Sequence, residues 1–112
     1  VLLNPSWRLG STFFGNFHTF LFQLAPSAGV YRPSGANENF QWLAANFQSL
    51  QNGIGFGGKK EGSFALYVDK DLERGRSQLD ATFDSPCLTA GGSPSGDFVI
   101  HTIECWEVAP PK

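Results

Sequence analysis

Short runs rich in aromatic and β-branched residues recur along this chain, and segments that contain glycine and proline separate them. The sequence has 11 Phe, 3 Trp and 2 Tyr, together with 13 Gly and 7 Pro. Aromatic and β-branched side chains fit the pleated surface of a sheet, whereas glycine and proline favour turns. A chain of 112 residues is long enough for one compact core. We therefore predict one mainly β domain over 1–112: a β-sandwich of two antiparallel sheets with a few short helices.

Six segments have the length and the alternation of apolar and polar residues that are typical of strands. They are residues 18–24, 28–32, 39–44, 47–51, 63–69 and 98–108. Alternation predicts two inward-facing sets of side chains, namely Phe20, Phe22 and Leu24 in the first segment and Phe64, Leu66 and Val68 in the fifth. The last segment is apolar on both faces, which predicts a strand covered on two sides and a buried Trp106.

Two connections carry specific local signals. Asn52-Gly53 is a strong tight-turn pair. Residues 71–75 are expected to form a single helical turn, which Asp71 caps and Gly75 ends.

The glycine-rich stretch 53–60 comes close to the phosphate-binding pattern GxxxxGK followed by Ser or Thr. Position 60 is Lys, so the hydroxyl that would ligate magnesium is absent. The segment that follows is a predicted strand and not a helix whose N-terminus could hold an anion. We therefore expect Gly57 and Gly58 to act structurally, by adopting positive φ or by allowing two backbones to approach closely.

Residues 69–75 begin like a calcium-binding loop, with acids at the first, third and fifth places. The sixth place is Arg74 and the twelfth is Asp80, whereas an EF-hand needs Gly and Glu there. We interpret the stretch as a capped turn with a solvated charge pattern, and we expect no metal site.

No catalytic arrangement is apparent, and we expect neither a catalytic residue nor a cofactor. His18 and His101 lie in separate predicted strands, and neither has a second ligand at metal-binding spacing. Glu104 lies in the most apolar segment and is a candidate for a perturbed carboxylate. Structural pairing of this acid with Arg8, Arg32 or a backbone group explains its position as well.

The sequence has two cysteines, Cys87 and Cys105, both in apolar surroundings. Two are too few for a disulfide framework, and an isolated cysteine behaves as a small apolar residue. We predict that both are reduced, which favours a cytoplasmic location. The net charge of −2 gives no reason to expect nucleic acid as a partner. No run of roughly 18 apolar residues occurs, so we expect no membrane insertion.

Charge is unevenly distributed along the chain. Five of the eight basic residues lie between positions 59 and 76: Lys59, Lys60, Lys70, Arg74 and Arg76. From Asp80 to Glu107 there are five acids and no base. A bipolar surface of this kind suits a protein interface, and the same pattern also fits ordinary solvated loops. For an interface, we place the contact on Lys59, Lys60, Asp71, Glu73, Arg74 and Arg76.

Four motifs occur in an order that resembles the TLDc family. They are Gly57-Gly58 and residues 64–77 (FALYVDKDLERGRS), 82–88 (TFDSPCL) and 98–106 (FVIHTIECW). Residues 13–15 (FFG), 19–22 (TFLF) and 31–40 (YRPSGANENF) fit the middle section of the same family, so the resemblance covers nearly the whole chain. The family's domain begins with helical segments and a strand pair before this region. We therefore expect 1–112 to lack the N-terminal helices and first strands of the domain.

The resemblance implies a β-sandwich with small helices in the cytoplasm of a eukaryotic cell. Family members are associated with resistance to oxidative stress, and several bind the vacuolar proton-pumping ATPase. Subunits of this ATPase are therefore the implied partners, with recruitment to the lysosomal or vacuolar surface. Our leading hypothesis is a non-enzymatic interaction and regulatory domain. The alternatives are a structural component of a large assembly and an enzyme that uses Glu104 or a cysteine.

Overall fold

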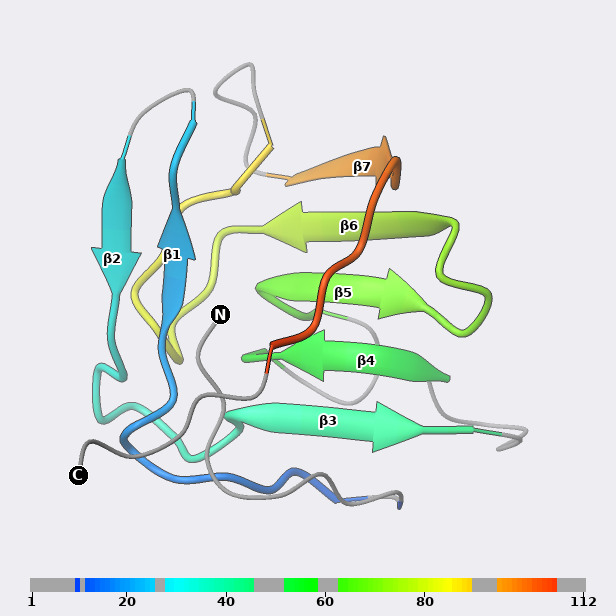
Figure 1. Cartoon of the computed structure of the whole chain (residues 1–112). Helices are drawn as coiled ribbons and strands as arrows, with labels where there is room; N and C mark the ends of the chain where they lie inside the picture. The colour runs from blue at the N-terminus through cyan, green and yellow to red at the C-terminus, as the bar shows by residue number, and fades with distance from the viewer. Residues whose placement is uncertain are drawn as a thin grey trace, which may run out of the picture.

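The computed structural model describes residues 10, 12–25, 28–45, 52–58, 63–89 and 95–106 (Figure 1). Their strands are β1 (Leu21–Gln23), β2 (Gly29–Tyr31), β3 (Gln41–Ala44), β4 (Gly53–Phe56), β5 (Leu66–Asp69), β6 (Arg74–Gln78) and β7 (Ser95–Val99). The prediction of a mainly β fold with two antiparallel sheets is confirmed. The described ranges contain no helix, and thus none that is long and apolar enough to cross a membrane.

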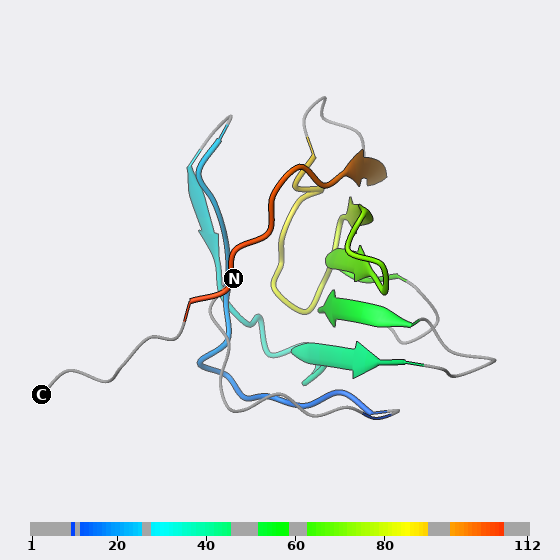
Figure 2. The same ribbon diagram turned by 45° about the vertical axis from the view of Figure 1, so that its right-hand side comes forward.

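The strands are connected in simple order. β1 pairs with β2, and β3 to β7 form a five-stranded sheet in which each strand pairs with the next along the chain. Figure 2 shows the small sheet standing opposite one face of the large sheet. Antiparallel pairing agrees with the short connections within β1–β2 and from β3 to β6, because parallel neighbours need a crossover of about a dozen residues or more. The longer connection 79–94 also joins an antiparallel pair, β6 and β7.

The main core lies between the two sheets. Leu21 of β1 and Phe56 of β4 enter it from opposite sides, at 1% and 4% exposure. The rings of Phe40 and Phe83 and the methyl group of Ala65 complete the buried cluster. Full burial of one large apolar side chain contributes roughly 1.5–3 kcal/mol, so this cluster holds the small sheet against the large one.

The pairing register of the large sheet shows which residues lie on the face that points away from the main core. Phe56 projects into the main core, and its neighbour Gly55 lies opposite Trp42 of β3 and Tyr67 of β5. Successive residues of a strand project from opposite faces. Trp42 and Tyr67 therefore lie on the face that points away from the small sheet, which we call the outer face.

A second aromatic cluster covers the outer face at its β3 end. Trp42 is fully buried beside Phe64, and the ring of Phe13 packs on both, with centroids 5.1 Å from Trp42 and 6.1 Å from Phe64. Reciprocal backbone hydrogen bonds between Phe14 and Gln41 of β3 hold Phe13 in this position.

The inward face of β1 is opposite to the predicted one. Leu21 is buried, whereas Phe22 and Leu24 are 42% and 79% exposed. Phe22 lies directly opposite Val30 of β2, whose side chain is also exposed. The buried phase carries Thr19 and Leu21 and is the less apolar of the two. Contact with the large sheet, and not local hydrophobicity, therefore selects the phase that is buried.

The prediction that Phe64, Leu66 and Val68 share one face is also wrong. β5 begins at Leu66, and the chain bends at Ala65. Phe64 therefore packs with Trp42 on the outer face, whereas Leu66 packs against the main core. Alternation predicts a common face only while the backbone remains an uninterrupted strand.

The glycine-rich stretch contains a strand that the sequence analysis missed. β4 begins at Gly53 and pairs with both β3 and β5, so Asn52-Gly53 leads into a central strand and is not a tight hairpin turn. The predicted strand 47–51 lies outside the described residues.

The last predicted strand is wrong in length and burial. β7 ends at Val99, and residues 100–106 continue as an irregular segment that runs from the large sheet towards the small one (Figures 1 and 2). Trp106 is 80% exposed, so it is not a core residue of this structure. Within the described ranges β7 pairs with β6 alone, and no further strand continues the sheet beside residues 100–106. Residues 107 and 108 lie outside the described ranges.

Candidate interaction site

The connection between β5 and β6 is a hydrogen-bonded hairpin loop and not the predicted helical turn. The amide of Leu72 donates to the carbonyl of Asp69 at 3.0 Å, and the amide of Glu73 donates to Asp69 Oδ1 at 3.0 Å. The second hydrogen bond, from Glu73, lowers the pKa of the Asp69 carboxyl. Leu72 has a φ of 59°, which ends any helical path at this position. Asp71 and Glu73 are exposed on this loop.

β6 carries its charged side chains on the outer face. Arg74 and Arg76 are exposed, whereas Gly75 and Ser77 alternate with them and are buried. Arg76 Nε donates to Asp97 Oδ1 across the β6–β7 pair at 2.6 Å. Both side chains of this ion pair are largely exposed, so water screens the interaction.

Gly75 explains why β6 and β7 can pair so closely at this point. Phe98 lies directly opposite Gly75, and a Cβ at position 75 would overlap the ring of Phe98. The ring occupies the inner face, where Gly75 has no side chain. Arg74 and Arg76, on either side of this glycine, therefore project from the outer face.

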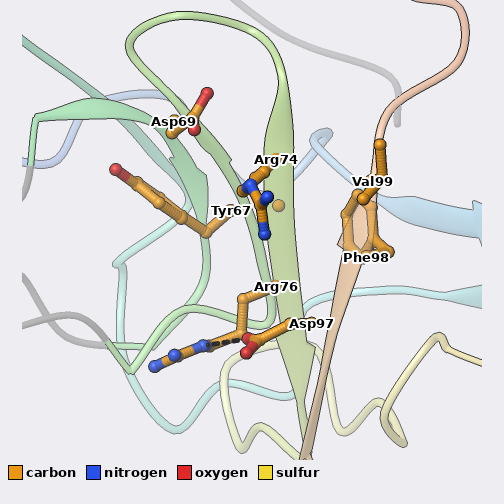
Figure 3. A pocket seen from close by; sticks show the side chains of 8 residues that line it. Tyr67, Asp69, Arg74, Arg76, Asp97, Phe98 and Val99 are labelled. Atoms are coloured by element: carbon orange, nitrogen blue, oxygen red, sulfur yellow. Dashed lines mark hydrogen bonds and ion pairs between the residues drawn. The ribbon is translucent and has the colours of Figure 1, made fainter.

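A shallow cavity of about 620 Å³ opens over β5, β6 and β7 (Figure 3). Its lining combines two cations, two carboxylates and apolar surface: Tyr67, Asp69, Arg74, Gly75, Arg76, Asp97, Phe98 and Val99. The ring of Tyr67 stacks on Phe64 with a centroid distance of 5.5 Å, so the aromatic cluster continues to the edge of the cavity. Small-molecule sites are predominantly apolar, and the four charged side chains distinguish this lining from them.

The structure brings together only part of the predicted interaction surface. Arg74 and Arg76 line the cavity, while Asp71 and Glu73 lie on the neighbouring loop without lining it. Lys59 and Lys60 lie outside the described residues.

Most of the lining was not predicted as part of an interaction surface, and Tyr67, Asp97 and Val99 are the residues of this kind that lie opposite the arginines. They come from β5 and β7, and strand register alone places them beside the arginines: Tyr67 and Asp97 both lie opposite Arg76, and Val99 lies opposite Arg74. No local sequence signal shows which residues face one another across strands.

Gly57 and Gly58 lie away from this cavity, at the end of β4. Their φ values are 73° and 77°, and a Cβ on Gly58 would overlap the carbonyl of Ser63. The amide of Gly58 donates to Thr82 Oγ1 at 3.0 Å, and this hydroxyl donates to Asn37 Oδ1 at 2.8 Å. The amide of Gly58 thus links its loop to the loops of Thr82 and Asn37. The described residues after these glycines form a strand and not the helix of a phosphate-binding loop.

Asp80 is a buried carboxylate beside these contacts, at 8% exposure. Burial raises the pKa of Asp80, and the amide of Phe83, which donates to Asp80 Oδ2 at 3.1 Å, partly offsets that rise. A Cβ on Gly57 would lie 2.6 Å from the same oxygen. This packing accounts for Asp80 as a structural residue of the 80–85 turn.

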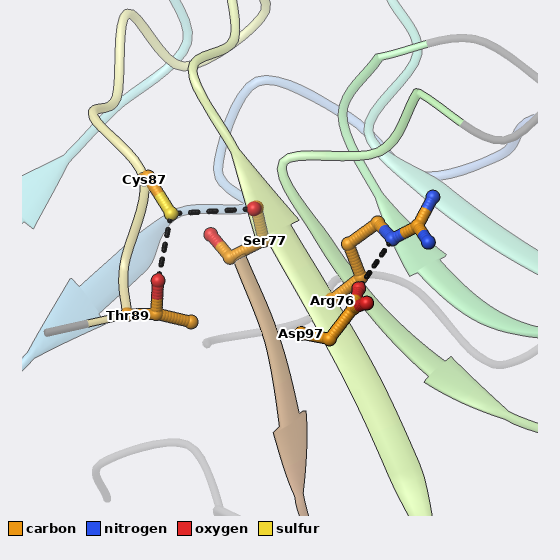
Figure 4. A network of polar contacts seen from close by, with 5 residues as sticks. All are labelled: Arg76, Ser77, Cys87, Thr89 and Asp97. Carbon is orange, nitrogen blue, oxygen red and sulfur yellow. Dashed lines mark hydrogen bonds and ion pairs between the residues drawn. The ribbon is translucent and has the colours of Figure 1, made fainter. Parts of the chain in front are cut away.

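Cys87 and Cys105 are free thiols in different surroundings. The thiol of Cys87 is partly buried, donates to the carbonyl of Ser77 at 3.3 Å and lies 2.9 Å from Thr89 Oγ1 (Figure 4). Cys105 is exposed, which corrects the view that both cysteines are small core residues.

The other candidate catalytic residues do not converge. His18, His101 and Glu104 are all exposed. The suggested pairing of Glu104 with Arg32 is not formed, and Arg32 lies over the ring of Phe20 at 4.9 Å. Within the described ranges, no three His, Cys, Asp or Glu side chains are grouped to hold a metal ion.

Comparison with known proteins gives consistent matches over nearly all of this chain. The family model described as TLDc domain matches residues 1–109. The chain is 36% identical over 108 residues to the MTOR-associated protein MEAK7 of Xenopus laevis, and 34% identical over 110 residues to that of Homo sapiens. It is 33% identical over 106 residues to the Oxidation resistance protein 1 of Xenopus tropicalis.

These matches cover 94%, 96% and 95% of this chain, but only 22%, 23% and 11% of the respective relatives. The chain therefore spans less than a quarter of the length of each of these relatives.

Proposed function

Because this chain belongs to the TLDc domain family, we propose that it is a non-enzymatic protein-interaction domain that regulates a large assembly. The first partner that we propose is the vacuolar proton-pumping ATPase, and the associated role is protection against oxidative stress. Binding to this partner would place the domain at the lysosomal or vacuolar surface.

The observation that carries this proposal is the part of the outer face over β5, β6 and β7, where the cavity lies. Arg74 and Arg76 project there from a rigid central strand, and Tyr67 and Val99 provide apolar surface beside them. Rigid strands hold such groups in a fixed arrangement, and mixed charge gives a partner both orientation and selectivity. This face is well suited to docking a second protein.

The absence of a converging acid–base or metal group among the described residues supports an interaction role over catalysis. Nucleophilic or general acid–base chemistry needs side chains within hydrogen-bond reach of one another. Glu104 and Cys105 are both exposed on the irregular segment 100–106.

The relatives' names support a second candidate partner. Two of the relatives are named as MTOR-associated proteins. We therefore include mTOR as an alternative partner of the same face, to be tested beside the ATPase.

The test is a pull-down in which the immobilised chain is offered purified vacuolar ATPase and, separately, purified mTOR. Reversal of both arginines, Arg74→Glu with Arg76→Glu, should weaken capture of the true partner by about tenfold or more, which corresponds to roughly 1.4 kcal/mol of binding free energy. Surface substitutions of this kind usually change stability by only about 0.5 kcal/mol each, so the melting temperature should remain close to that of the wild type.

Lys70→Glu is the matched control. Lys70 is an exposed cation of the same hairpin that does not line the cavity, so its reversal should leave capture unchanged. Equal capture by the wild type and the double variant would exclude this face as the contact. Capture of neither partner by the wild type would exclude both partner assignments.

A further inference from the structure

Among the described residues, β7 is the outermost strand of the large sheet (Figure 1). Asp97, Phe98 and Val99 of this strand line the cavity. The hydrogen-bonding register of β7 follows from one contact beyond its end, in which the amide of Ile100 donates to the carbonyl of Glu73 at 2.8 Å. In an antiparallel pair, facing residues alternate between those that exchange hydrogen bonds and those that do not. Since Ile100 faces Glu73 in a bonded pair, Phe98 faces Gly75 in the next bonded pair.

Asp97 and Val99 are therefore the non-bonded positions of β7. Each faces an arginine of β6, Asp97 opposite Arg76 and Val99 opposite Arg74. At such positions the amide and carbonyl groups point away from the paired strand. The backbone groups of Asp97 and Val99 thus point outwards, and no described residue pairs with them. An unpaired strand edge is a template for a further strand.

The side chains of the same two residues project from the outer face, beside the cavity. Val99 is 62% exposed and offers apolar contact. Asp97 is already paired with Arg76 at 2.6 Å. Arg74 makes no ion pair in the described part of the chain, although Asp69 lines the same cavity, so its guanidinium is available to a carboxylate of a partner.

The distances permit Arg74 to reach a strand added beyond β7. Neighbouring strands lie about 4.8 Å apart, so an added strand would lie about 10 Å from β6. An extended arginine on β6 can pass over Val99, and a glutamate on the added strand can meet it from the other side. A planar guanidinium paired with a carboxylate is a strong and directional contact.

We propose that the β7 edge accepts an extended peptide segment of a partner protein as an additional strand, and that Arg74 selects a segment with an acidic residue opposite Val99. The residue two positions along the added strand lies opposite Asp97, where a second acid would be repelled. The preferred segment therefore carries one acid with a neutral residue two positions away. This inference rests on the proposed function and specifies how the partner is recognised.

The probe is the fluorescently labelled hexapeptide acetyl-Thr-Val-Glu-Val-Thr-Val-amide, titrated against the whole chain and followed by fluorescence anisotropy. Two control peptides separate the two parts of the proposal. One replaces Glu with Lys, and the other carries N-methyl groups on alternate backbone amides, which prevents strand pairing but keeps the charge. Both controls should bind about tenfold more weakly than the probe or worse.

Hydrogen exchange locates the bound peptide. Saturating probe should slow exchange of the Asp97 and Val99 amides by about tenfold or more, since these amides become bonded. The Phe98 amide, which already bonds to β6, should change little. Protection elsewhere, with none at Asp97 and Val99, would overturn strand addition at this edge.

Two variants test the residues directly. Val99→Pro removes one outward-pointing amide, and proline is tolerated at such positions of edge strands. Arg74→Glu reverses the selecting charge, and Arg74→Lys should restore part of the binding. Val99→Pro and Arg74→Glu should each weaken probe binding by about tenfold or more. If Val99→Pro fails to fold, the N-methylated peptide tests the same hydrogen bonds without any change in the protein.

The outcomes separate this inference from the proposed function. If ATPase or mTOR capture depends on Arg74 and Arg76 but survives Val99→Pro, the proposed function stands and strand addition is overturned. If the probe protects Asp97 and Val99 while neither protein is captured, strand addition stands and the partner assignments fall.

Discussion

The ring of Phe64 occupies the space that a side chain at position 55 would need: a Cβ on Gly55 would lie 2.5 Å from Phe64 Cδ1. Gly55 lies in central strand β4, where a larger residue would ordinarily stabilise the sheet. Here the glycine lets Phe64 pack flat against β4 and under Trp42, at a centroid distance of 6.2 Å. This contact builds the aromatic cluster on which the outer face depends.

Gly55→Ala should therefore destabilise the chain by about 1–3 kcal/mol, because the added methyl group forces the Phe64 ring or the strand to move. The free energy of unfolding from urea denaturation measures this change. Gly10→Ala is the matched control, since a Cβ on Gly10 would meet nothing within 4 Å. Equal effects of the two substitutions would contradict the packing described here.

Truncation of two tryptophans should have very different effects on the free energy of unfolding. Trp42 is fully buried in the aromatic cluster, so Trp42→Ala should reduce the free energy of unfolding by about 3–5 kcal/mol. Trp106 is 80% exposed, and Trp106→Ala should change it by no more than about 0.5 kcal/mol. Both variants can be compared with the wild type by urea denaturation. A large loss for Trp106→Ala would place its ring in a core.

Asp80→Asn should alter the dependence of stability on pH. Burial raises the pKa of Asp80 above its ordinary value of 3.8, so the folded chain holds this proton more tightly than the unfolded chain. The stabilising effect of the protonated form is complete below about pH 4, and it is lost as the pH rises through the raised pKa. Asn cannot ionise, so the stability of the variant relative to the wild type should increase between about pH 3 and pH 7.

Asp69→Asn is a control variant whose stability relative to the wild type should change with pH in the opposite direction. The Glu73 amide lowers the pKa of Asp69, so its ionised form stabilises the folded chain above about pH 4, and this effect is lost as the pH falls through the lowered pKa. The stability of this variant relative to the wild type should therefore decrease as the pH rises. Parallel pH curves for Asp80→Asn and the wild type would show that Asp80 titrates normally.

The ion pair between Arg76 and Asp97 should contribute little to stability despite its 2.6 Å contact. Both side chains are more than half exposed, at 55% and 73%. A double-mutant cycle with Arg76→Ala and Asp97→Ala should give a coupling energy below about 1 kcal/mol. This coupling should fall further when the salt concentration rises. A larger coupling that resists salt would indicate that the pair is shielded from water.

The fold class and several strands could be predicted from sequence because they depend on local composition. Aromatic-rich runs bounded by turn residues disfavour helices, and the predicted segments 28–32 and 39–44 contain β2 and β3. β4 was missed because three of the residues around it are glycines, Gly53, Gly55 and Gly57. Glycine is a poor strand former, and its presence is explained only by tertiary contacts, with the Phe64 ring at Gly55 and the Val68 carbonyl at Gly53.

The candidate site was predicted only in part. The clustered charges predicted Arg74 and Arg76 as interaction residues, and both line the cavity. Tyr67, Asp97 and Val99 join them through pairing between strands that are separated along the chain. Pairing of this kind depends on the whole sheet and leaves no mark in a local window of sequence.

By itself, the sequence determined that this chain forms sheets, because side-chain shape, turn residues and alternation act over a few neighbouring positions. The tertiary structure alone decided which phase of β1 is buried, on which side Phe64 packs, and that Trp106 is exposed. A strand has two phases of alternation, and in the β1 segment the less apolar phase, with Thr19 and Leu21, is the buried one. The choice between them comes from contacts with residues distant along the chain, and those contacts exist only after the sheets have packed.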